Sequence, residues 1–194
     1  MSPKRIANLL VPDRSVRWYF LILNGVFAVS FYTGIFAPFD AGKEVTDALK
    51  ALAGQSVDMA GGTLFLFILL NNAFASLLLL FLGMLGGVIP VLSVGFNGFV
   101  LGMIYRHAAE AVGYEEAALN LIPHAFFEIP ALLFTASYGM WLGVGVIRRI
   151  RRKEASPLGT MVNHAFERYF SVVFPLLIVA AAIETILILR GVRG

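Results

Sequence analysis

Residues 63–82 read TLFLFILLNNAFASLLLLFL, and this stretch decides the class of the fold. It holds no charged residue, and about 20 apolar residues in a helix are enough to cross the hydrocarbon core of a bilayer. The whole chain has the same character, since it is 59% hydrophobic and 14% charged, with a mean hydropathy of +0.82. Soluble domains are usually about 25% charged. The sequence therefore predicts an integral membrane protein.

Four further stretches are long and apolar enough to span a membrane. Together they predict an all-α bundle of about five transmembrane helices in one membrane domain, residues 1–194, with short loops. The chain has no cysteine, which excludes disulfides, cysteine metal ligands and a cysteine nucleophile. The predicted spans are residues 18–38, 63–82, 87–105, 119–147 and 170–189.

The charges between the spans predict the orientation. The segment before the first span and the loop between the fourth and fifth spans carry net charges of +3 and +4, whereas the two remaining charged loops each carry −2. Basic segments stay on the cytoplasmic side of the membrane. We therefore expect a cytoplasmic N-terminus. The basic charge is a topology signal, and no nucleic-acid partner is expected.

The fourth span is too long for a simple crossing. As a straight helix, residues 119–147 would reach about 43 Å, against a hydrocarbon core of about 30 Å. Pro123 and Pro130 offer the reason, because a proline inside a helix removes one backbone hydrogen bond and kinks the helix. We expect a helix break here, as either a half-helix before the true span or one bent helix. The sequence GFNG, residues 95–98, predicts a second interruption, in the third span.

Polar side chains inside the spans form the candidate site, because polar groups at membrane depth are costly and usually functional. His124 and Glu128 are four residues apart and share one helix face. They could share a proton, form an ion pair, or satisfy backbone groups that the prolines leave free, and these alternatives stay open. The predicted intramembrane polar cluster comprises Asn71, Asn72, Asn97, His124, Glu128 and Glu184.

The same residues argue against a metal site and against an enzyme. One His and one Glu make at most half of a catalytic zinc site, which usually has three protein ligands. No recognisable serine nucleophile motif is present, so we expect no catalytic residue and no cofactor. Glycines spaced four apart let helices approach closely, within the chain or in a homodimer. These predicted packing positions are Gly98, Gly102, Gly139 and Gly143.

Four motifs in this order resemble the stage II sporulation protein M family of membrane proteins. They are FILLNNAFASLLLLFLGMLGG from residue 67, FNGFVLG from residue 96, PHAFFEIPALL from residue 123 and GMWLG from residue 139. The resemblance implies a polytopic protein in the cytoplasmic membrane of a bacterium or archaeon. In spore formers the namesake of the family works with peptidoglycan-degrading partners as a membrane scaffold. The family often has a glycine where this chain has Ala125. The resemblance marks six positions of this chain as characteristic of the family, namely Asn72, Asn97, Gly98, His124, Glu128 and Pro130.

Three functions follow from the sequence. The resemblance, the short loops and the incomplete catalytic set favour a non-enzymatic scaffold for membrane or cell-envelope proteins. Polar residues at mid-membrane favour a transporter or channel subunit. An intramembrane hydrolase in which Glu128 activates water is the third alternative, and it requires a wet cavity.

Overall fold

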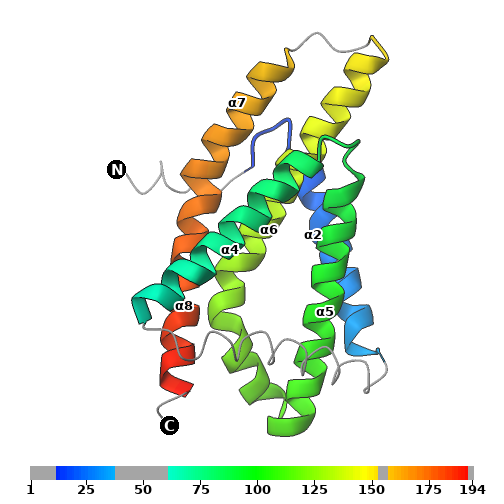
Figure 1. Cartoon of the computed structure of the whole chain (residues 1–194). Coiled ribbons are helices and arrows are strands. Elements are labelled where there is room, and N and C mark those ends of the chain that lie inside the picture. Colours follow the sequence, from blue (N-terminus) through cyan, green and yellow to red (C-terminus); the bar gives the residue numbers. More distant parts are fainter. Residues whose placement is uncertain (1–11, 38–60, 153–156, 192–194) are drawn as a thin grey trace.

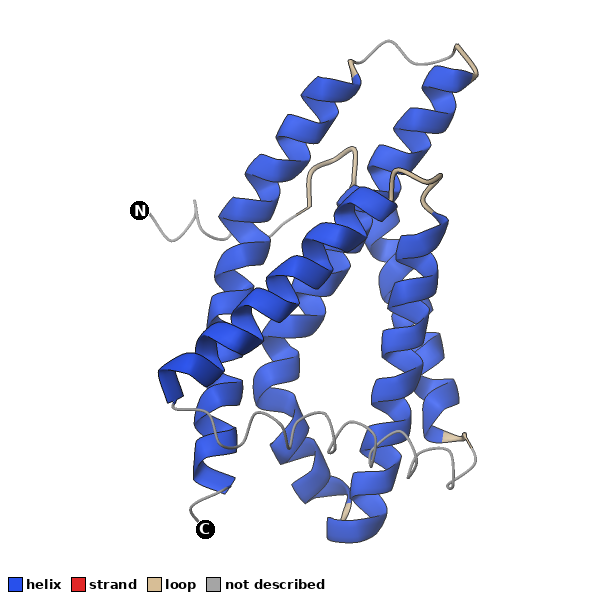
Figure 2. Ribbon diagram, viewed as in Figure 1, coloured by secondary structure: helices blue, strands red, loops and turns tan. Residues whose placement is uncertain are grey.

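The computed structural model describes residues 12–37, 61–152 and 157–191, with the side chains of Asn120 and His124 outside the description. All regular structure in these residues is helical (Figure 2). Five helical runs are long and apolar enough to cross a membrane, which confirms the predicted all-α membrane fold. The elements are α2 (Arg17–Ile35), α4 (Gly61–Leu82), α5 (Val88–Val112), α6 (Tyr114–Ile150), α7 (Leu158–Arg168), the π-helix η1 (Tyr169–Val173) and α8 (Phe174–Gly191).

Helix α6 is the centre of the bundle. It packs against α2 and α5 on one side and against α4 and α8 on the other (Figure 1). In the part of α6 that can span the membrane 61% of the residues are buried, against 11% in α2. Helix α2 therefore lies at the edge of the bundle, where its apolar residues suit contact with lipid.

Glycines shape the turn between α4 and α5. Gly86 and Gly87 have φ angles of 79° and 78°, a left-handed conformation that glycine adopts without steric cost. Only a few residues of α4 touch α5, because the two helices diverge from this turn (Figure 1). The hairpin of α4 and α5 is thus tight at its turn and open at its far end.

Helices α5 and α6 are both continuous at the positions where the sequence predicts a break or an interruption. The interruption expected at residues 95–98 is wrong, since α5 is helical throughout and the Asn97 amide donates to the Ser93 carbonyl of the same helix (2.8 Å). Pro123 and Pro130 lie inside one continuous α6, whose N-terminal part turns towards the end of α5 (Figure 1). The fourth segment is therefore a single helix that changes direction.

The helix that contains the last span begins before the predicted span does. One helical run extends from Leu158 to Arg190, whereas the predicted span starts at residue 170. The π-helix η1 joins α7 to α8, and its first residue, Tyr169, is buried. The Tyr169 hydroxyl lies 2.8 Å from the hydroxyl of Ser76 and 3.0 Å from the carbonyl of Ala73, both on α4. These contacts tie the π-turn, a local feature often found at functional sites, to the neighbouring helix.

Candidate functional site

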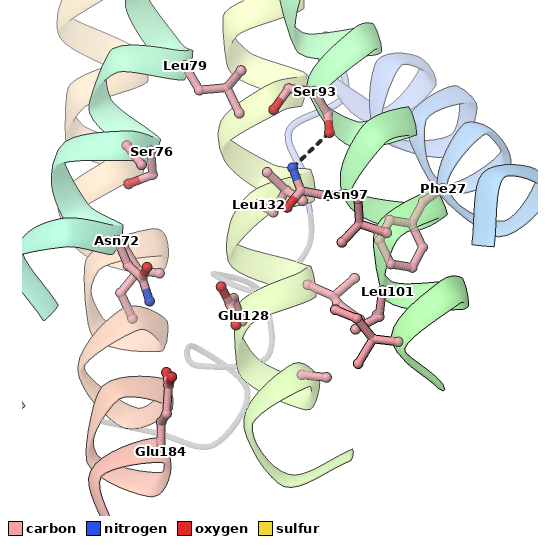
Figure 3. Close-up of a pocket in the computed structure, with 16 residues that line it drawn as sticks. Phe27, Asn72, Ser76, Leu79, Ser93, Asn97, Leu101, Glu128, Leu132 and Glu184 are labelled. Atoms are coloured by element: carbon pink, nitrogen blue, oxygen red, sulfur yellow. Dashed lines mark hydrogen bonds between the residues drawn. The ribbon is translucent and has the colours of Figure 1, made fainter. Parts of the chain in front are cut away.

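A polar cavity of about 490 Å³ lies between the membrane helices. Its walls come from α4, α5, α6 and α8, with one aromatic residue from α2, so that no single helix could form it (Figure 3). Cavities of about 300–1,000 Å³ are typical of sites for small molecules. The lining residues that carry the argument below are Asn72, Ser76, Asn97, Ala125, Glu128 and Glu184.

Four amide and carboxyl side chains reach this cavity from four different helices. Figure 3 shows Asn72 of α4 and Glu184 of α8 pointing into the open space from one side. Glu128 of α6 points towards them, and Asn97 of α5 lies on the other side. Because Asn97 donates to its own helix, its side-chain oxygen is the atom that remains to accept a hydrogen bond.

The course of α6 sets the position of Glu128. A proline lacks an N–H group, so Pro130 leaves the carbonyl of Phe126 without its usual helical donor. Glu128 lies between these two residues. Ala125, one turn earlier, also lines the cavity, and its small side chain leaves space there. The bend and the small residue together give the carboxyl group room to face the neighbouring helices.

The chemistry of the described lining residues suits binding. Two carboxyl groups and two amides supply acceptor oxygens, and none of the described lining residues is Lys, Arg or His. The hydroxyl of Ser76 is engaged with Tyr169 and with the carbonyl of Ala73 (3.0 Å). Within the described part of the chain, no three His, Cys, Asp or Glu side chains gather to hold a metal ion.

Of the six residues in the predicted polar cluster, four line the cavity. Asn71 does not: it is exposed on α4, about 100° around the helix from its neighbour Asn72. His124 lies within α6, but its side chain is outside the described residues, so its pairing with Glu128 stays a prediction.

The four glycines that the sequence singled out lie at helix contacts within the chain. A Cβ atom added at Gly98 or Gly102 would meet the backbone of α2, and one added at Gly139 would meet the backbone of α4. At Gly143 it would overlap the backbone of the turn between α4 and α5. These close approaches hold α5 against α2 and hold α6 against the hairpin turn, so they set the positions of the cavity walls.

A second polar cluster, which the sequence did not reveal, centres on Asp13. Tyr138 of α6 donates to Asp13 Oδ2 (2.5 Å), and His164 Nε2 lies 2.7 Å from the same oxygen. Arg168 donates to Asp13 Oδ1 and to the Tyr138 hydroxyl, both at 3.1 Å. Partial burial raises the pKa of Asp13, but the hydrogen bonds from Tyr138 and His164 and the charge of Arg168 outweigh burial and hold it below its usual value.

This Asp13 cluster joins the segment before α2 to α6 and α7. In the sequence its members lie far apart and share no local pattern. A single acidic residue in the basic segment before the first span was the one signal that could have drawn attention to it. The cluster lies outside the cavity and fixes the end of the bundle at which α7 begins.

Comparison with known proteins gives one result. The model of the family described as Stage II sporulation protein M matches residues 21–187, which cover the five spans almost completely. Comparisons with curated proteins and with solved structures found no match. The match includes every described residue of the cavity and agrees with the resemblance drawn from the four motifs. The chain is thus a multi-pass membrane protein that belongs to the stage II sporulation protein M family.

Proposed function

We propose that this protein binds a small, positively charged solute in the polar cavity and serves as a transporter or channel subunit for it. The observation that carries the proposal is the meeting of Asn72, Asn97, Glu128 and Glu184, from four helices, at one cavity of about 490 Å³. Each polar group costs free energy at membrane depth. Four such groups facing one space indicate a shared ligand or water, because tight packing alone would not require them.

The donor and acceptor pattern favours an amine. Carboxylates accept hydrogen bonds and attract positive charge, and a protonated amine supplies several N–H donors. Glu128 faces the side of the cavity that holds Glu184 and Asn72 (Figure 3). A solute with an amine at each end could therefore meet a carboxyl group at both walls. We take 1,4-diaminobutane as the probe of this class.

Purified full-length protein in proteoliposomes tests the proposal by uptake of three labelled probes that share a four-carbon backbone. We expect uptake of 1,4-diaminobutane, and little uptake of neutral 1,4-butanediol or anionic succinate. Losing one charge-assisted hydrogen bond should lower uptake by about tenfold or more, so Glu128→Gln should do so. Glu116→Gln is the matched control, because Glu116 is exposed at the start of the same helix. Equal uptake by liposomes with and without protein, for all three probes, would exclude the proposal.

A second candidate function is a scaffold for membrane or cell-envelope proteins in the cytoplasmic membrane, with the N-terminus inside. Family membership favours it. The orientation is supported by Glu115 and Arg148, which lie in the first and last turns of α6 and so at opposite ends of that helix. Mild detergent extraction followed by purification tests the scaffold role. Recovery of the chain in a fixed ratio with one envelope protein would support it, and recovery of the chain alone would count against it.

A further inference from the structure

An amide group in the middle of α4 faces out of the bundle. Asn71 is exposed, does not line the cavity, and makes no hydrogen bond within the described part of the chain. Two other membrane amides behave differently, since Asn24 donates to the carbonyl of Phe20 and Asn97 to that of Ser93. Neither Asn71 nor Asn72 bonds to its own helix, but Asn72 lines the cavity whereas Asn71 is exposed outside it. An amide in hydrocarbon without a partner costs free energy, so an outside partner is expected.

The surface around Asn71 has the spacing of a helix–helix seam. Phe67, Phe74 and Leu78 lie at the i−4, i+3 and i+7 positions, and their exposed fractions are 53%, 70% and 45%. This alternation of steps of four and three is the a/d pattern of a left-handed coiled coil, with Asn71 at an a position. The apolar part of the pattern suits lipid equally well, as on α2, where Val29 is 66% exposed. The amide distinguishes the α4 face from the α2 face.

We propose that the α4 face Phe67–Asn71–Phe74–Leu78 binds a second copy of this chain, with Asn71 bonded to Asn71 of that copy. Two copies in one membrane share their orientation, so a two-fold axis between them must run along the membrane normal. The two α4 helices then run parallel, and the same residue of each copy lies at the same depth. A carboxamide both donates and accepts, so two identical amides satisfy each other across such an axis. One asparagine at an a position is also known to specify register and two-stranded assembly.

The chain is well suited to a crosslinking test because it contains no cysteine. A disulfide forms only when the two Cβ atoms come within about 3.5–4.5 Å, a spacing that d positions reach across a parallel seam. We therefore expect Phe74→Cys, in full-length protein in membranes, to give a dimer band after mild oxidation. Val29→Cys is the matched control, because Val29 is as exposed as Phe74 and lies in the middle of another span.

The role of the amide is tested in the Phe74→Cys background. Asn71→Leu should lower the apparent association constant of the dimer by about 3- to 20-fold, the range for one hydrogen bond between membrane helices. Asn71→Gln keeps the amide and should retain most of the association. Because Asn71 is exposed, both variants should fold, and Phe67→Cys provides an independent crosslinking position.

Four results would overturn the proposal. Phe74→Cys and Phe67→Cys could both fail to crosslink, or Val29→Cys could crosslink at the same rate, which would show random collision. Asn71→Leu could leave the association constant unchanged, which would show that the amide plays no part. Crosslinking of Phe74→Cys to a different protein and never to itself would assign the face to that partner.

Discussion

The contact between α6 and the turn from α4 to α5 gives the sharpest prediction about the fold. Gly143 lies where an added Cβ atom would overlap the carbonyl oxygen of Gly83 and the amide nitrogen of Gly87. All three nearest atoms belong to the backbone of the turn, so no side chain can move aside to make room. We predict that Gly143→Ala pushes α6 away from the hairpin and destabilises the protein.

The magnitude follows from two opposing effects. Overpacking a buried contact typically costs about 1–3 kcal/mol, and replacing glycine by alanine inside a helix returns about 0.5–1 kcal/mol. The net loss for Gly143→Ala therefore lies between about 0 and 2.5 kcal/mol, and the backbone clash, which no side chain can relieve, places it in the upper part of that range. For a chain of this size each kcal/mol lowers Tm by about 2–4 °C, so Tm should fall by up to about 10 °C.

Gly145 supplies the matched control on the same helix. There the added Cβ atom would meet only the tip of Met161, with Cε at 2.5 Å and Sδ at 2.9 Å. Methionine is flexible and can shift by changing rotamer. Gly145→Ala should therefore leave Tm unchanged or raise it slightly, since it gains the same helix propensity. Thermal unfolding of the two variants in one detergent is the assay. Equal Tm values for Gly143→Ala and wild type, or a larger loss for Gly145→Ala, would refute the reasoning.

Three further predictions concern the polar contacts and the bend. Because the folded pKa of Asp13 lies below the reference value of 3.8, its carboxylate stabilises the fold above that pH, and the effect disappears as the pH falls through the folded pKa. Asp13→Asn should therefore lower Tm at neutral pH, and in a pH series the difference from wild type should shrink below about pH 4 and vanish only below the folded pKa of Asp13. Tyr169→Phe removes the contacts with α4 and should cost about 0.5–1.5 kcal/mol in thermal unfolding, whereas Tyr32→Phe, at an exposed position, should not. Pro130→Ala restores a backbone donor and should raise Tm while lowering uptake of 1,4-diaminobutane, because a straighter α6 moves Glu128 away from the opposite wall.

The fold class and the four main polar residues of the cavity could be predicted from the sequence, for a physical reason. Uncharged runs of about 20 residues have one stable solution in a chain this apolar, which is a membrane helix. The same cost of polarity marked Asn72, Asn97, Glu128 and Glu184 before any geometry was known. Which of the polar groups meet was not predictable, because it depends on how far α4 and α5 diverge from their turn. The glycines at residues 86 and 87 permit the turn, but they do not set the angle between the helices.

The Asp13 cluster could not be predicted from the sequence, for a different reason. Its contacts join Asp13 to residues 125, 151 and 155 positions away, and no local pattern records such distances. The orientation prediction used Asp13 and Arg168 only as charges in their loops, because it depends on the net charge of each loop and not on which residues pair. Their pairing depends on the continuous helix that begins at Leu158, before the apolar run that marks the predicted span.

The adjacent amides of Asn71 and Asn72 show what the structure adds to the sequence. In the sequence they are identical neighbours, and only the angle of about 100° between successive helical residues separates them. The structure directs Asn72 to the cavity and Asn71 to the outer face of α4. If the two sites are independent, Asn72→Leu should lower uptake of 1,4-diaminobutane and leave dimer crosslinking at wild-type strength, while Asn71→Leu should do the reverse. A double variant should then show both losses without a further penalty, because the two side chains share no partner. Loss of both activities in either single variant would mean that the dimer and the cavity form one functional unit.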